Sequence, residues 1–144
     1  MSVAGDPLGE WLGTLELRVL RLQDVELPQD FVLDYSADSL SRLAAVLLDR
    51  LADPDDVGQP EHEGLVLSAA AYVGESLLRV GGGEWRWVDQ PGGAAGLPVA
   101  VPDPALDLPP VSPVEVIADT VRARDGGRFA ALHAAWTRAA DAVR

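Results

Sequence analysis

The fold is decided by residues 69–88, which read Ala-Ala-Ala-Tyr-Val-Gly-Glu-Ser-Leu-Leu-Arg-Val-Gly-Gly-Gly-Glu-Trp-Arg-Trp-Val. Before the three glycines, apolar residues recur with the period of a helix. After the glycines, bulky and charged residues alternate around Trp85 and Trp87, which is the period of a strand. The stretch therefore predicts a helix that stops at the glycines and passes directly into a strand.

The helix of about 60–80 is apolar around most of its circumference. On a wheel of about 100° per residue, apolar side chains cover roughly 260°. The remaining narrow stripe contains Gly64, Ser68, Glu75 and Arg79. A helix of this kind is surrounded by protein, so we expect it to be the central helix of the fold. Gly74 lies within the apolar arc and predicts a close approach of another backbone there.

Gly81, Gly82 and Gly83 predict a helix end with at least one residue in the left-handed conformation. A phosphate-binding loop is disfavoured, because such loops precede a helix and these glycines follow one. Residues 84–88 predict a strand with both tryptophans on one face and Arg86 and Val88 on the other. Residues 97–101 are its expected antiparallel partner, across a turn at 91–96.

The N-terminal part predicts two further helices. Asp6 and Pro7 resemble a helix cap and first turn, followed by apolar residues at helical spacing to Leu22. Alternation over residues 15–19 leaves a strand open as the other interpretation. Residues 31–33 predict a short strand, and a helix capped by Ser36 is expected to run to about Leu51.

Prolines dominate residues 102–112 and predict an extended crossover on the surface. A capping box at 112–115 begins a helix that runs to about Arg124. After a break at 125–127, an apolar stripe predicts a C-terminal helix through Phe129, Leu132, Trp136, Ala140 and Val143. Together these elements predict one α+β domain over residues 1–144, with about five helices around a small antiparallel sheet.

Two motifs resemble a known family. They are Ala71-Tyr72-Val73-Gly74-Glu75 on the helix and Gly83-Glu84-Trp85 on the strand, with a related helix start at residues 35–40. These features are similar to small bacterial domains of unknown function that are common in high-GC genomes. The resemblance covers about residues 34–125, and the proline-rich segment and alanine-rich C-terminal helix depart from it. It implies no activity, because the family has no established one.

The charge of the chain restricts its partners. Eleven basic residues, all arginine, stand against 23 acidic residues, which gives a net charge of −12. Nucleic acids and anionic membranes would be repelled, whereas a basic protein would be attracted. Cysteine is absent, so thiolate chemistry is excluded. No signal peptide or membrane-length apolar run is seen, and a cytoplasmic location is expected.

No catalytic grouping is recognisable. His62 and His133 are the only histidines and lack the spacing of metal ligands, so no metal, cofactor or catalytic residue is expected. The candidate binding residues are Glu75, Arg79, Trp85, Arg86 and Trp87. For Glu75 and Arg79, which are four positions apart, an exposed ion pair is the alternative interpretation.

Two functional hypotheses follow. The first is a small acidic, non-catalytic binding or regulatory protein, of the kind that neutralises a basic partner as immunity proteins and antitoxins do. The alternative is a small-molecule binder or hydrolase with a cleft around Glu75, Arg79 and Trp85 or Trp87.

Overall fold

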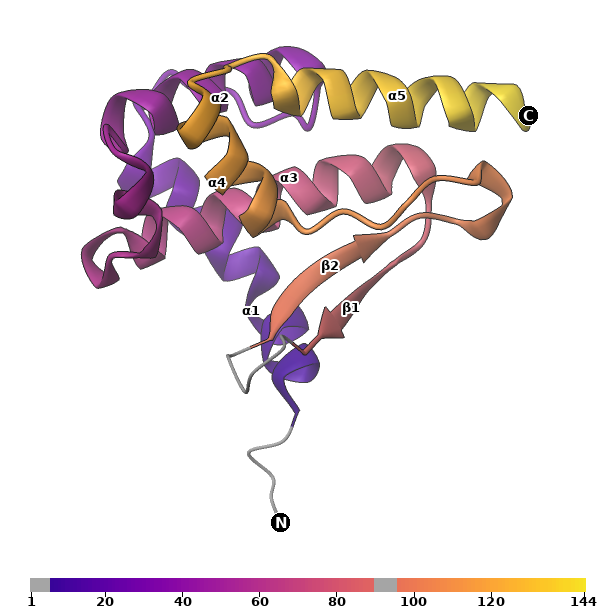
Figure 1. Cartoon of the computed structure of the whole chain (residues 1–144), viewed down its shortest axis with the longest axis horizontal. Coiled ribbons are helices and arrows are strands. Elements are labelled where there is room, and N and C mark those ends of the chain that lie inside the picture. The colour runs from indigo at the N-terminus through magenta and orange to yellow at the C-terminus, as the bar shows by residue number, and fades with distance from the viewer. Residues whose placement is uncertain (1–5, 90–95) are drawn as a thin grey trace.

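The computed structural model describes residues 6–89 and 96–144. Five α-helices pack with one two-stranded antiparallel sheet, so the α+β prediction is confirmed (Figure 1). The elements are α1 Pro7–Arg21, α2 Ala37–Arg50, α3 Glu63–Gly81, β1 Glu84–Val88, β2 Leu97–Val101, α4 Pro113–Ala123 and α5 Arg128–Ala142.

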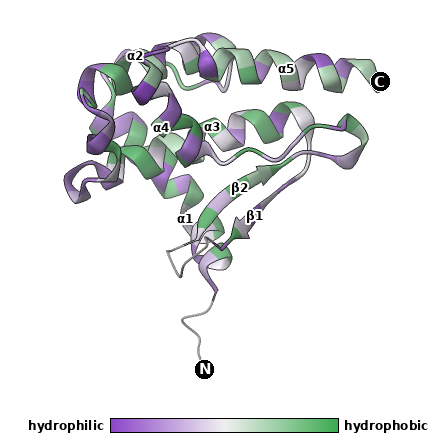
Figure 2. Ribbon diagram, in the orientation of Figure 1, coloured by the Kyte–Doolittle hydropathy of each residue, from purple (hydrophilic) through white to green (hydrophobic). Residues whose placement is uncertain are grey.

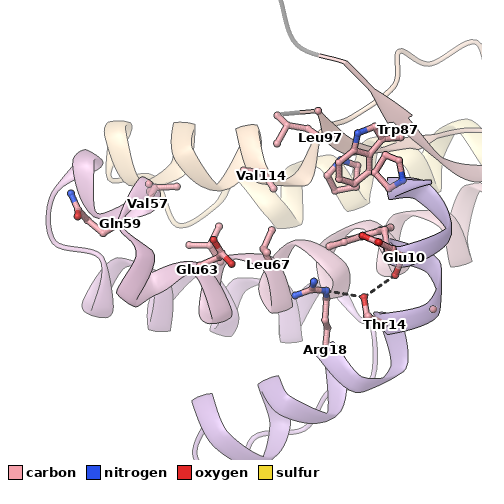
Figure 3. Close-up of a pocket in the computed structure, with 17 residues that line it drawn as sticks. Glu10, Thr14, Arg18, Val57, Gln59, Glu63, Leu67, Trp87, Leu97 and Val114 are labelled. Atoms are coloured by element: carbon pink, nitrogen blue, oxygen red, sulfur yellow. Dashed lines mark hydrogen bonds between the residues drawn. The ribbon is translucent and has the colours of Figure 1, made fainter. Parts of the chain in front are cut away.

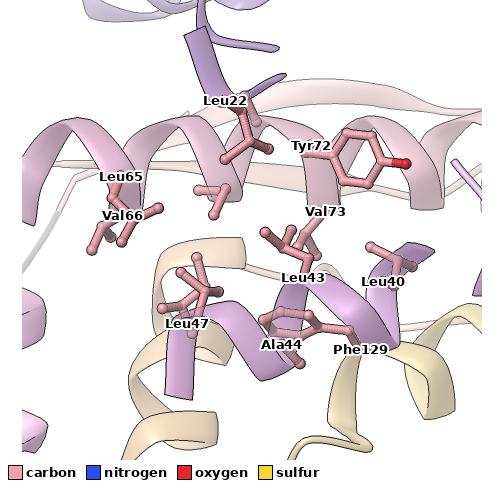
Figure 4. Close-up of a cluster of buried hydrophobic side chains, with 14 of the residues drawn as sticks. Leu22, Leu40, Leu43, Ala44, Leu47, Leu65, Val66, Tyr72, Val73 and Phe129 are labelled. Atoms are coloured by element: carbon pink, nitrogen blue, oxygen red, sulfur yellow. The ribbon is translucent and has the colours of Figure 1, made fainter. Parts of the chain in front are cut away.

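Helix α3 is the centre of the molecule, as expected. It contacts α1, α4, α5 and β2, and Figure 1 shows α2 and α5 on one side of it and the hairpin on the other. Apolar side chains from α2, α3 and α5 meet in one cluster (Figure 4). Apolar and polar residues alternate along the helix ribbons in Figure 2, which is typical of helices that bury one face.

Side-chain caps begin three of the helices at the predicted positions. The Asp6 carboxylate accepts from the Gly9 N–H at 2.9 Å, Ser36 accepts from the Ser39 N–H at 3.1 Å, and Ser112 accepts from the Glu115 N–H at 3.4 Å. Each bond satisfies one of the amide groups that a helix start leaves unpaired. The cap at Asp6 favours the helix over the strand at 15–19, and α1 is continuous through that stretch.

Two local predictions are wrong, and a third holds only in part. Residues 31–33 form no strand: the Phe31 N–H bonds to the Pro28 carbonyl in a turn. The proline-rich segment runs mostly along the surface as predicted, but Val111 is buried and pairs with Ala100 through bonds of 2.8 and 2.9 Å. The prediction that Val143 belongs to the apolar stripe of the C-terminal helix is wrong. Val143 is 53% exposed, because α5 ends at Ala142 and this end extends beyond the end of α3 (Figure 1).

The hairpin has the predicted strands and faces. Trp85 pairs with Ala100 and Trp87 with Pro98, so both tryptophans lie on one face and Arg86 lies on the other. Its predicted turn falls mostly on residues 90–95, outside the described residues.

The glycines that lead into the hairpin have a steric role. Gly82 and Gly83 both have positive φ, 69° and 103°, although Gly82 has ψ −171° and so lies outside the left-handed helical region. A Cβ at Gly83 would stand 2.0 Å from the Val101 carbonyl oxygen. Only glycine allows the chain to turn from α3 into β1 this close to β2.

Candidate functional site

The predicted binding residues do not all line one cleft: Glu75 and Arg79 share a cavity of about 380 Å³ with Tyr35, and Trp87 lines a different one. Glu75 on α3 reaches the hairpin, where its Oε2 accepts a hydrogen bond from Trp85 Nε1 at 2.8 Å. The alternative interpretation, an exposed ion pair between Glu75 and Arg79, is wrong: among the described residues no ion pair joins these two side chains. The Glu75 carboxylate bonds to the Trp85 indole, and the Arg79 guanidinium lies over the Tyr35 ring, 3.7 Å from its centroid.

Trp85 is a packing residue that ties the hairpin to the helices. It is 6% exposed, and its ring lies where a Cβ at Gly74 would be, 2.0 Å from Trp85 Cη2. The close approach predicted at Gly74 is therefore real, but an indole ring makes it in place of a backbone. On its other side Trp85 meets Trp11 of α1 edge to face, with ring centroids 5.3 Å apart.

Arg79 belongs to an aromatic stack above the start of α2. Tyr35 stacks on Tyr72 with centroids 4.9 Å apart, and the Tyr72 hydroxyl accepts from the Tyr35 N–H at 2.6 Å and lies 2.7 Å from Ser39 Oγ. Burial raises the pKa of the Tyr72 phenol above its ordinary value, partly opposed by the hydrogen bond with Ser39. These bonds hold Tyr35 at φ 62° and give the stack a structural role.

Asp34 lies beside Ser36 at the start of α2. The Asp34 carboxylate accepts from both the hydroxyl and the N–H of Ser36, and these bonds lower the Asp34 pKa. Arg86 is separate from all of these residues: it lies on the exposed face of β1 and pairs with Glu84 at 2.8 Å.

Trp87 lines a groove of about 880 Å³ (Figure 3). Its walls come from α1, the turn before α3, the first half of α3, the hairpin and the start of α4. The lining residues are Pro7, Glu10, Trp11, Gly13, Thr14, Arg18, Val57, Gly58, Gln59, Glu63, Val66, Leu67, Trp87, Gly96, Leu97, Pro98 and Val114.

Sequence reasoning found only Trp87 of this set. Helical spacing places Trp11 in the apolar stripe of α1, and Val66 and Leu67 in the apolar arc of α3. Helical spacing predicts that such residues turn toward other protein. It does not predict that α1 and the hairpin leave a space between them.

Arg18 supplies the positive charge inside the groove. Its Nε donates to Thr14 Oγ1 at 3.1 Å, Thr14 in turn donates to the Trp11 carbonyl at 3.0 Å, and the guanidinium carbon lies 5.1 Å from the Trp11 ring centroid. Partial burial lowers the Arg18 pKa, and the nearby Glu63 carboxylate opposes that shift. These contacts hold the guanidinium in place at the edge of the groove, where it is bonded to Thr14 (Figure 3).

The described residues offer little for metal binding. Within residues 6–89 and 96–144, no three histidine, cysteine or acidic side chains gather closely enough to hold an ion. In the acidic turn at residues 53–58, Asp53 and Asp56 accept hydrogen bonds from backbone N–H groups of the turn itself.

Within residues 6–89 and 96–144, no helix combines the length and apolar character needed to cross a membrane.

Comparison with known proteins adds no assignment to this geometry. No family model, curated protein or solved structure matches the chain. The resemblance to small bacterial domains of unknown function therefore stays a prediction.

Proposed function

We propose that this protein is a non-catalytic binding protein whose groove receives an apolar segment of a partner protein. The observation that carries the proposal is the groove itself, about 880 Å³ in volume, with Trp11, Leu67 and Trp87 among its apolar walls. Aromatic side chains such as these dominate the binding energy of protein interfaces when they enclose a partner's side chains. The proposal includes a regulatory role in which the protein neutralises its partner by binding it, as immunity proteins and antitoxins do.

The form of the groove favours a chain segment over a small molecule. Its lining residues extend from Trp87 on the hairpin, past Leu67, to Val57 and Gln59 before α3 (Figure 3). Gln59 and the polar residues Glu10 and Glu63 are exposed, so the groove is open along its side. Long, open apolar grooves suit helical or extended segments, whereas small-molecule sites enclose most of their ligand.

The polar groups of the groove support binding without catalysis. Thr14 has the one hydroxyl among its described lining residues, and this hydroxyl is already engaged as donor to Trp11 and as acceptor from Arg18. No histidine or cysteine lies with it among those lining residues. A nucleophile needs an adjacent base to activate it, and Thr14 has a guanidinium as its neighbour.

Gly13 allows the groove to be blocked without disturbing the fold. A Cβ there has no atom within 4 Å, so Gly13→Leu places a side chain into open space and also replaces a glycine within a helix. A random peptide library is selected on the wild-type protein, and the dissociation constants of the enriched peptides are measured by fluorescence anisotropy. We expect one-to-one binding that Gly13→Leu weakens by at least about tenfold.

The matched control is Gly126→Leu. Its added Cβ would meet only Leu48 Cδ1, at 3.5 Å, and Gly126 is not among the groove residues. We expect the control to bind the enriched peptides as the wild type does. Peptides that bind the Gly13→Leu protein as tightly as the wild type, or a selection that enriches none, would contradict the proposal.

A further inference from the structure

Carboxylates from separate parts of the chain converge on the groove. Glu10 comes from the first turn of α1 and Glu63 from the first turn of α3, and both are exposed lining residues. Asp53, Asp55 and Glu61 are also exposed, and each lies within four positions of the lining residues Val57 or Gln59 along the chain. The rim of this apolar groove is therefore negatively charged.

The positive charge of Arg18 does not reverse this field. Its guanidinium is partly buried against Trp11, bonded to Thr14 and influenced by the nearby Glu63 carboxylate. An incoming charge first meets the exposed carboxylates of Glu10 and Glu63. The long-range field of a chain with net charge −12 acts in the same direction.

We infer that the occupant of the groove is a cationic amphipathic segment of a partner protein, with apolar side chains flanked by lysine or arginine. This inference rests on the proposed binding function. The apolar side chains pack on the partly exposed Leu67, Trp87 and Val114, while the basic groups face Glu10 and Glu63. Lysine and arginine suit the rim because their aliphatic stems cover apolar surface while their charged ends stay in water.

Charge also opposes the other occupants of an apolar groove. A second copy of this chain brings its own −12 against the same field, and an acidic segment meets like charge at the rim. Opposite charges at a rim mainly speed association and select the partner, and salt screens them. The partner's charge is thus measurable apart from its apolar fit.

The test uses three synthetic helical peptides that share one apolar stripe of leucine and tryptophan. Their remaining positions carry lysine and arginine, or glutamine, or glutamate. Binding to the full chain is measured by fluorescence anisotropy at low and at physiological salt. We expect the basic peptide to bind about tenfold more tightly than the glutamine peptide at low salt, with an advantage that shrinks as salt rises.

Two charge variants separate the rim from the general field. Glu10→Gln with Glu63→Gln removes two rim carboxylates, and Glu16→Gln with Asp24→Asn removes two exposed carboxylates that do not line the groove. The two variants have the same net charge as each other, two units less negative than that of the wild type. We expect the rim pair to weaken the basic peptide by about fivefold, and the control pair to weaken it by less than about twofold.

The outcomes distinguish this inference from the binding function. Equal affinity for the basic and glutamine peptides, equal effects of the two charge pairs, or preference for the glutamate peptide overturns the cationic partner and leaves the groove as a binding site. A dimer in sedimentation that Gly13→Leu dissociates makes a second copy the occupant and overturns the inference. Failure of all three peptides and of the selected library overturns both proposals.

Discussion

Two helical glycines, Gly13 and Gly74, have opposite surroundings. A Cβ at Gly13 would meet no atom within 4 Å, whereas at Gly74 it would stand 2.0 Å from Trp85 Cη2. Trp85 cannot easily yield, because Glu75 bonds its indole and Trp11 packs on its other side. The same residue type thus serves packing at one position and leaves space at the other.

Alanine at these two positions should change stability in opposite directions. Gly13→Ala should raise the free energy of unfolding by about 0.5–1 kcal/mol, because alanine is the better helix former. Gly74→Ala should lower it by about 1–2 kcal/mol, since overpacking outweighs the same propensity gain. Denaturant unfolding of both variants measures the difference. A stabilised Gly74→Ala protein would show that the Trp85 ring does not fill the space beside Gly74.

At the scale of elements, the hairpin is tied to α3 by the Glu75–Trp85 hydrogen bond. The bond spans a helix and a strand that are separated along the chain only by the glycine turn. Because the next residue on the same face of β1, Trp87, forms part of the groove wall, this tie also positions the groove. Glu75 therefore positions the hairpin, and the ligand contact predicted for it stays a prediction.

Replacing Glu75 tests the tie. Glu75→Ala leaves a buried indole N–H without its acceptor and should lower the free energy of unfolding by about 1–2 kcal/mol. Glu75→Gln keeps an acceptor oxygen and should lose less than half as much. Denaturant unfolding gives the energies, and the NMR signal of the Trp85 indole N–H reports the bond. If alanine and glutamine have equal effects, the hydrogen bond does not hold the hairpin.

For the whole molecule, the excess of acidic residues is the dominant electrostatic property. Ion pairs such as Arg42–Asp38 and Arg122–Asp119 lie on the surface, where each contributes little to stability. A net charge of −12 repels itself in the compact state.

Added salt should therefore stabilise the fold. We expect the free energy of unfolding to rise as sodium chloride increases from low to physiological concentration, because screening weakens the repulsion among carboxylates more than it weakens the few exposed pairs. Thermal unfolding at a series of salt concentrations measures this. A melting temperature that falls with salt would mean that the surface ion pairs outweigh the repulsion.

Local chemistry predicted the helices and the hairpin well. Side-chain caps at Asp6, Ser36 and Ser112 act within one turn of the chain, so their effect is written in neighbouring residues. The same holds for the apolar arc of α3 and for the alternation around Trp85. The strand expected at residues 31–33 failed because a strand needs a partner edge, and sequence near Phe31 contains no information about where such an edge lies.

The sequence by itself determined the class of the fold, the central position of α3, the glycine stop and the negative charge, because these depend on periodicity, caps and composition. Only the tertiary structure decided which residues meet. It paired Glu75 with Trp85 and not with Arg79, and it opened a groove between α1, α3 and the hairpin. Such contacts join residues far apart in the chain, and their geometry follows from the packing of whole elements.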